Sequence, residues 1–374
     1  TISDAYGSNE KRAIVNSVVQ NWDISSTNSP DAFIALGSAG KSTAFKPFQG
    51  SIAEMILFDR ALTFVERIQY ETYLAIKYGT GIKGGNLLSS DARVLWHGEQ
   101  NNAYGNHIAG IGRDDHFGLY QKQSGSAYDS GLLVISAGPV AELNEKNNTV
   151  IADQDFIVWG SNALPLTARR GDGADSVLSV IQRKWLATAS GNTASKIATD
   201  VYVDARMFPS NPMGYWLVID RSGRGNFSVD NLEYLLPDHV SNGRVVYKNV
   251  SWDTDLSGKD NFGFAQAFEL FAVVRKVKNP SCTDEDAGQV RIEVIGGEAP
   301  FQYTLTNAAD NIARSRKVNE KSSVESDLVE GEYLLTVTDR SKEAIDRTFR
   351  MVMPDALTID LGPDLQLGDD QDLV

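Results

Sequence analysis

The chain has 374 residues, of which 42% are hydrophobic and 22% charged, a composition typical of a folded protein with two or three domains. Its formal net charge of −14 argues against a nucleic-acid partner, because phosphate binding requires concentrated Lys and Arg. No apolar run reaches the ~20 residues that a membrane-spanning helix needs, so no transmembrane segment is expected.

The first fifty-eight residues contain three apolar runs that predict strands. Two candidates, 13–19 and 32–36, are separated by a stretch rich in Ser, Thr, Asn and Pro. The third, 52–58, is almost continuously apolar, which is typical of a strand covered on both faces. Because this third run comes so early, we expect residues 1–79 to be the C-terminal part of a larger antiparallel sandwich domain.

A helix is expected directly after the third apolar run. Thr63 and Glu66 match a capping box, in which each side chain accepts a hydrogen bond from the backbone amide of the other residue. Gly79 stands where a left-handed residue would end the helix. The sequence therefore predicts a single short α-helix over residues 63–78, followed by a glycine-rich connector.

Residues 84–275 predict a second β domain. Short apolar strand candidates recur along it, with turn signals such as Gly171-Asp172-Gly173 and Asn242-Gly243 between them. This spacing favours an antiparallel β-sandwich over alternating strands and helices.

Residues 276–354 predict a small immunoglobulin-like β domain. Residues 288–295 alternate between apolar and polar side chains, and further strand candidates lie at 299–305, 333–338 and 347–353. Cys282 is the single cysteine, which excludes an intrachain disulfide and a multi-cysteine metal site. Residues 355–374 are acidic and punctuated by Pro and Gly, as expected of a linker and the start of a further module.

Two segments of the first half resemble modules of very large surface proteins of gliding and other Bacteroidota. FQGSIAEMILFDRALTFVERIQYETYLAIKYGTGI, within residues 48–82, resembles the end of a laminin-G/concanavalin-A-like domain. VLWHGEQNNAYGNHIAGIGRDDHFGLYQKQS, residues 94–124, resembles the start of the β-rich module that follows it in those proteins. The resemblance implies tandem β-sandwich domains, beginning with a partial concanavalin-like jelly roll.

The third domain resembles the SprB-type repeats of gliding-motility adhesins. The resemblance lies in the glycine pair Gly296-Gly297 with Pro300 and Tyr303, and in the later Gly331-Glu-Tyr motif. It implies a cell-surface or extracellular location, export by type IX secretion and attachment at the outer membrane. The partners implied are surface glycans or other extracellular polymers, together with the secretion and anchoring machinery.

Calcium is the one cofactor that the side chains suggest. Asp253, Asp255 and Asp260 place carboxylates in a short loop, and calcium prefers six to eight oxygen ligands. The spacing does not match an EF-hand. The alternative is a hairpin turn in which the carboxylates accept backbone hydrogen bonds.

Two of the six tryptophans are candidates for carbohydrate contact. Trp22 and Trp252 lie near polar loops, where an indole ring could stack on a sugar. Trp159, Trp185 and Trp216 lie inside apolar strands and are expected in the core.

No pattern of residues predicts a reaction centre. His107 and His116 flank Asp114-Asp115, but they lack the close spacing of a metal or acid–base site, and a polar loop is the alternative. Glu54 is the one acid within a predicted buried strand, where a hydrogen-bonded carboxylate is the simpler interpretation. The sequence therefore predicts a non-enzymatic segment of a large adhesin that serves as spacer and adhesive modules. The alternative is a carbohydrate-binding module of a polysaccharide-targeting protein.

Overall fold

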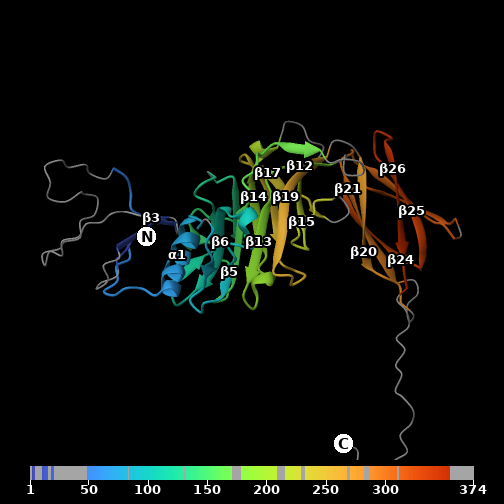
Figure 1. The fold of residues 1–374 in the computed structure, drawn as a ribbon. Coiled ribbons are helices and arrows are strands. Elements are labelled where there is room, and N and C mark those ends of the chain that lie inside the picture. The colour runs from blue at the N-terminus through green and yellow to red at the C-terminus, as the bar shows by residue number, and fades with distance from the viewer. Residues whose placement is uncertain are drawn as a thin grey trace, which may run out of the picture.

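A computed structural model describes residues 2–4, 11–15, 18–20, 49–82, 84–129, 131–170, 178–208, 215–228, 232–267, 270–281, 287–309 and 311–353. The fold within these ranges is mainly β, with antiparallel strand pairing and one α-helix, α1 (Phe64–Tyr78), which confirms the predicted fold class. Figure 1 shows the sheets in a row, with α1 toward one end and the C-terminal β domain at the other.

Three short strands near the N-terminus form an antiparallel sheet of their own: β1 (Ile2–Asp4), β2 (Lys11–Val15) and β3 (Val18–Gln20). The strand predicted at 13–19 is therefore divided into β2 and β3, with Val15 opposite Val18. The strand candidate at 32–36 and the candidate ligand residue Trp22 lie outside the described residues.

The prediction of a doubly covered strand at residues 52–58 is wrong for the described structure. The segment contains no strand, and Ile52, Met55 and Leu57 are 52%, 44% and 61% exposed. An apolar run becomes a buried strand only where neighbouring strands pair with it and other layers of the fold cover both of its faces. Within the described residues no strand pairs with this segment, and it lies instead along α1, where Ile56 packs against the apolar cluster around the helix.

Helix α1 forms where the local signals predict it. The Thr63 hydroxyl accepts a hydrogen bond from the Glu66 amide at 3.2 Å, and the Glu66 carboxylate accepts one from the Thr63 amide at 2.8 Å. Gly79 ends the helix with φ +63°, and its amide donates to the carbonyl of Ala75. The capping box and the left-handed C-cap therefore determine both ends of the helix.

Nine strands form the largest sheet, here called the central sheet. Its main path runs in the order β11 (Ala168–Arg170), β12 (Leu178–Ile181), β19 (Lys259–Ala267), β13 (Trp185–Ser190), β10 (Phe156–Ser161), β6 (Asn106–Asp114) and β7 (Leu119–Gln121). Strand β15 (Tyr215–Asp220) joins it through β19, and β16 (Glu233–Leu235) pairs with β15. Because β19 pairs with β12, β13 and β15, it holds the two halves of the sheet together.

A five-stranded sheet, here called the flanking sheet, packs on one face of the central sheet. Its order is β17 (His239–Ser241), β18 (Arg244–Val250), β14 (Thr199–Asp204), β9 (Leu133–Ala137) and β8 (Gln123–Gly125). The predicted Asn242-Gly243 turn joins β17 to β18, and both residues have positive φ. The two sheets enclose one apolar core that contains Trp159 and Trp185, as predicted for these residues.

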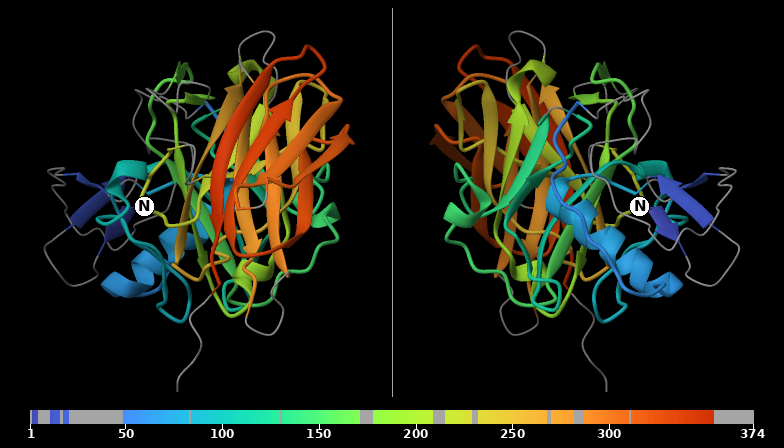
Figure 2. Two further views of the ribbon diagram at one scale, coloured as in Figure 1. Left: turned by 90° about the vertical axis from the view of Figure 1, so that its right-hand side faces the viewer. Right: turned by 90° about the vertical axis from the view of Figure 1, so that its left-hand side faces the viewer.

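The other face of the central sheet is covered first by α1 and by a ribbon of β4 (Leu87–Leu88) and β5 (Val94–Trp96). Ile76 of the helix and Trp96 of the ribbon share an apolar cluster with Phe156 and Val158 of β10. The right-hand view of Figure 2 shows the helix lying across these strands. The helix that the sequence assigns to the preceding domain thus packs on the module that follows it.

The C-terminal β domain has two sheets, here called the inner and outer sheets of the repeat. The inner sheet contains β20 (Phe271–Lys278), β21 (Gly288–Ile295) and β24 (Ser322–Leu328). The outer sheet contains β23 (Ala313–Val318), β22 (Phe301–Asn307), β25 (Gly331–Thr338) and β26 (Ala344–Met351). A separate apolar core lies between them, and the left-hand view of Figure 2 shows this repeat from its outer side.

Candidate functional site

The loop between β18 and β19, which contains the three predicted calcium ligands, is a tight turn with three positive φ angles, at Asp253, Leu256 and Gly258. The Asp253 carboxylate accepts a hydrogen bond from the Gly258 amide at 2.6 Å, and the Asp255 carboxylate accepts one from the Ser257 amide at 3.1 Å. These carboxylates cap backbone amides inside the turn, which is the alternative that the sequence left open.

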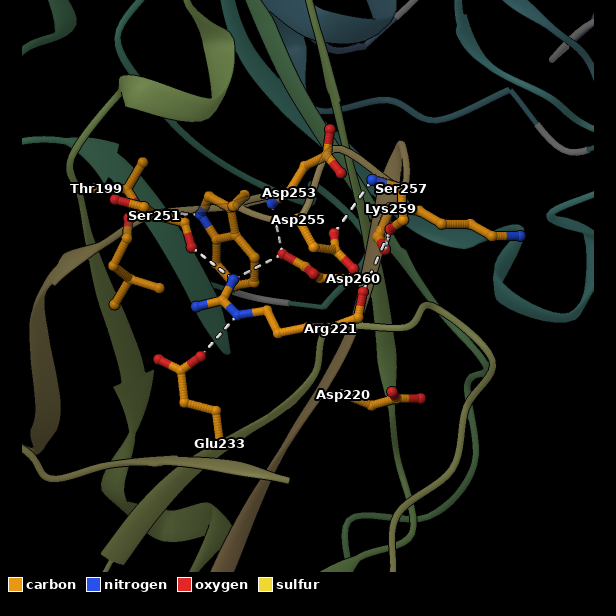
Figure 3. A network of polar contacts seen from close by, with 12 residues as sticks. Thr199, Asp220, Arg221, Glu233, Ser251, Asp253, Asp255, Ser257, Lys259 and Asp260 are labelled. Carbon is orange, nitrogen blue, oxygen red and sulfur yellow. Dashed lines mark hydrogen bonds and ion pairs between the residues drawn. The ribbon is translucent and has the colours of Figure 1, made fainter. Parts of the chain in front are cut away.

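Arg221 lies at the centre of a polar network beside this turn (Figure 3). Its guanidinium donates to the Asp260 carboxylate at 2.8 Å, to the Ser251 carbonyl at 2.7 Å and to the Glu233 carboxylate at 2.7 Å. The same Asp260 oxygen accepts a hydrogen bond from the Asp253 amide at 2.6 Å. The network joins the ends of β15 and β18 to β16 and β19, so it ties the central sheet to the flanking sheet.

The charges of this network are buried to different extents, since the side chains of Arg221 and Glu233 are 19% and 35% exposed. Asp260 is 0% exposed, and burial raises its pKa to about 6 while the Arg221 guanidinium limits the rise. Burial lowers the pKa of Arg221, but the hydrogen bonds and charges of Glu233 and Asp260 outweigh it, so that pKa stays above its ordinary value. The pKa of Asp253 is also raised, chiefly by burial. The guanidinium is therefore the cation that compensates the carboxylates here.

The three predicted calcium ligands are engaged by neighbouring groups in this arrangement. One oxygen of Asp253 and one of Asp255 accept hydrogen bonds from amides of the turn, and the Asp260 carboxylate accepts one from Arg221. In Figure 3 the Asp253 carboxylate points away from the carboxylates of Asp255 and Asp260. Within the described ranges no group of three or more His, Cys, Asp or Glu residues is arranged to hold a metal.

Trp252 is not placed to contact a sugar. Its side chain is 1% exposed, its indole N–H donates to the Thr199 hydroxyl at 2.9 Å, and its ring lies 4.7 Å from that of Phe262. Stacking on carbohydrate requires an exposed ring face, and this ring belongs to the core between the two sheets. The alternative of a carbohydrate-binding module therefore loses Trp252 and retains only Trp22, which lies outside the described residues.

The histidine pair considered in the sequence does not come together. His107 lies at the start of β6 with Nδ1 2.7 Å from the Ser161 hydroxyl, whereas His116 follows the other end of the strand and contacts Phe117. At about 3.3 Å per residue the strand separates them by roughly 20 Å or more. Asp114 accepts a hydrogen bond from the Ser90 amide.

Glu54 is the hydrogen-bonded carboxylate that the simpler interpretation expects. It accepts hydrogen bonds from the Lys77 ammonium at 2.8 Å and from the hydroxyls of Tyr73 and Tyr78 at 2.9 and 2.8 Å. The Lys77 hydrogen bond holds the pKa of Glu54 below its ordinary value. These contacts attach the exposed segment 49–58 to helix α1.

Sequence reasoning missed Arg221, Glu233 and Ser251, which complete the network around Asp260. Arg221 and Asp260 are separated by 39 residues, and no motif connects them. The available signal was a charged residue directly after the apolar strand 215–220, where a side chain at a strand end can reach a neighbouring sheet.

Comparison with protein families confirms one part of the sequence interpretation. Residues 275–310 match the SprB repeat, which supports an SprB-type, adhesin-like segment and a cell-surface protein. No described helix has the length and apolar character to cross a membrane.

Comparisons with individual proteins add little. No curated protein matches the chain. Among solved structures, the glycoside hydrolase domain of Endo-D from Streptococcus pneumoniae R6 is similar at 13% sequence identity with a TM-score of 0.18. The similarity covers 51% of this chain and 37% of that one. That TM-score is too low to support a shared fold or a shared activity.

The remaining family match covers most of the β-sandwich module. Residues 66–256, just over half of the chain, match a model described as a domain of unknown function, DUF8202. The match begins inside helix α1 and ends before β19. On the basis of this coverage, the chain belongs to the DUF8202 domain family.

Proposed function

We propose that this chain is a non-enzymatic segment of a large cell-surface or secreted adhesin, in which β modules space and present an adhesive site. The observation that carries this proposal is the SprB-repeat match at residues 275–310, in the domain that directly follows the DUF8202 module. Antiparallel sheets suit such a role because every interior strand is held by two hydrogen-bonded neighbours.

The finer parts of the proposal follow from the resemblance to giant Bacteroidota surface proteins. We propose that the whole protein leaves the cell by type IX secretion and is attached at the outer membrane. Its ligands would be surface glycans or other extracellular polymers. The acidic composition, with a net charge of −14, is compatible with a hydrated surface segment.

The test is surface exposure on intact cells that produce the protein. An antibody raised against residues 84–353 is expected to label unpermeabilised cells, and externally added protease is expected to remove that label. Deleting the segment from the gene is expected to reduce attachment of the cells to a surface. Label that appears only after permeabilisation, or unchanged attachment in the deletion strain, would contradict the proposal.

A further inference from the structure

The central sheet has two apolar faces over the part formed by β15, β16 and β19. In β15, Leu217 and Ile219 face the core shared with the flanking sheet. Trp216 and Val218 alternate with them along the strand. They are also buried, at 1% and 0% exposed, but in a different apolar cluster. Side chains alternate between the faces of a strand, so Trp216 and Val218 lie on the opposite face of the sheet.

The inner sheet of the repeat has two apolar faces as well. In β20, Ala272 and Val274 face the core of the repeat, whereas Phe271 and Val273 lie in the same cluster as Trp216. Phe271 and Val273 are each 3% exposed, and Ile295 of β21 joins them at 0%. These residues are buried by Trp216, Val218 and Tyr234 of the module, together with Ile345 and Arg347 of the repeat's own strand β26.

Cationic side chains of the repeat lie over aromatic rings of the module at the rim of this contact. The Arg275 guanidinium lies 5.4 Å from the centroid of the Tyr234 ring, and Glu293 accepts its hydrogen bond at 2.9 Å. The Lys321 ammonium lies 5.7 Å from the centroid of the Trp216 ring. Both distances are within the range of cation–π attraction, which fixes the relative position of the two partners more closely than apolar contact alone.

The covalent connection between the two parts is short. Strand β19 of the central sheet ends at Ala267, and β20 of the repeat begins at Phe271. Domain boundaries that permit motion fall in longer polar linkers that few contacts cross. Here an apolar cluster with residues from both parts spans the boundary.

We propose that the DUF8202 module and the SprB-type repeat form one rigid, cooperatively folding unit, in which the repeat's inner sheet is the required cover for the β15–β16–β19 face. The four sheets are then stacked as continuous layers: flanking, central, inner and outer. On the face of the central sheet away from the flanking sheet, helix α1 covers the part around β10 and β6. The repeat covers the part formed by β15, β16 and β19. This inference holds whether or not the protein is an adhesin.

The test compares two substitutions on one strand of the full chain. Val273→Asp places a charge in the contact between module and repeat, whereas Val277→Asp introduces the same change near the end of the same strand, where the side chain is already 51% exposed. Scanning calorimetry of the unsubstituted chain is expected to show one cooperative transition for module and repeat. The Val273→Asp variant is expected to show two separate transitions at lower temperature, and the Val277→Asp variant a single one.

A second measurement tests whether the joint, meaning the contact between the module and the repeat, is rigid. With Cys282 replaced by Ser, dyes on cysteines introduced at the exposed positions Glu142 and Thr348 report the distance between module and repeat by single-molecule energy transfer. A narrow distribution that broadens only in the Val273→Asp background supports a rigid joint.

A flexible Gly–Ser insertion after Ala267 keeps the test informative if Val273→Asp does not fold. The packed joint is expected to hold the narrow distribution despite the longer linker. Two independent transitions in the unsubstituted chain, or a broad distribution that the insertion broadens further, would overturn the inference. Neither result depends on surface exposure in cells, so the joint can fail while the proposed function stands.

Discussion

Asp260 remains in the core because a guanidinium lies 2.8 Å from its carboxylate. Transfer of a lone carboxylate from water to the interior costs several kcal/mol, and Arg221 repays part of that cost through its charge and hydrogen bonds. One oxygen of Asp260 is buried without a hydrogen-bond partner among the described residues, so the compensation is incomplete. The raised pKa of Asp260, about 6, expresses the same imbalance.

Replacing Arg221 by Met is expected to lower the free energy of unfolding by about 3 kcal/mol, because Asp260 would lose its cation in the core. The matched control is Arg206→Met. Arg206 pairs with Asp204, but its side chain is 89% exposed, so the change is expected to stay within about 0.5 kcal/mol. Urea unfolding of both variants measures the difference. Equal losses would show that Arg221 does not stabilise the buried carboxylate.

The pH dependence of stability follows from the same group. The pKa of Asp260 rises from 3.8 to about 6 on folding, so between these values the folded state binds more protons than the unfolded state. The free energy of unfolding should therefore fall as the pH rises from about 4 to about 6, by about 3 kcal/mol from this group, and then level off. Asp129, whose pKa burial also raises to about 6, acts in the same direction.

The variant that checks this assignment is Asp260→Asn, in which the fall between pH 4 and pH 6 should shrink. Asp204→Asn is the control, because the hydrogen bond from Arg206 lowers the pKa of Asp204 to about 2 and its effect lies at lower pH. Chemical unfolding at half-unit pH steps measures the curves. A fall that is identical in Asp260→Asn and the unsubstituted chain would assign it elsewhere.

At the scale of single elements, a sequence pattern predicts the structure well when its residues are close together in the sequence. The capping box and Gly79 involve neighbours in sequence, and α1 forms between them. Trp216 lies in an apolar strand and is buried as expected, but the polar surroundings of Trp252 suggested exposure for a ring that is 1% exposed. Arg221 and Asp260 meet only because β15 and β19 pair, which no local pattern encodes.

The segment 52–58 illustrates the opposite error. Its apolar side chains favour burial, but the burial of a strand depends on what lies beside it. Among the described residues it lies against helix α1 on one side, through Glu54, Ile56 and Phe58. Pattern predicts which side chains favour burial, whereas the tertiary structure decides whether they are buried.

The C-terminal cap of α1 at Gly79 predicts a large loss of stability on substitution. A Cβ at Gly79 would lie 2.2 Å from the Gly125 carbonyl oxygen, in addition to the strain of φ +63°. Gly118 has nearly the same φ, +64°, with nothing within 4 Å of its Cβ position. Gly118→Ala is therefore expected to cost about 1–2 kcal/mol, and Gly79→Ala clearly more. Thermal unfolding of the two variants tests this, and equal costs would contradict the close approach.

At the scale of the whole molecule, stability is expected to be independent of calcium. The three candidate ligands of the 253–260 turn are occupied by backbone amides and by Arg221. Adding EDTA, or millimolar calcium after EDTA, should leave the Tm of the chain unchanged. Magnesium in place of calcium controls for ionic strength. A rise of Tm with calcium that Asp255→Asn abolishes would restore the calcium prediction for this turn.

The position of β19 has a practical consequence for anyone who expresses pieces of this gene. The DUF8202 match stops at residue 256, whereas the strand that joins β12, β13 and β15 runs from Lys259 to Ala267. A fragment trimmed to the family boundary would carry three unpaired strand edges, which promote aggregation. A fragment ending at residue 267 would restore those pairings but would expose Trp216 and Val218 to solvent, because they pack against the repeat. A soluble recombinant product should therefore extend through residue 353.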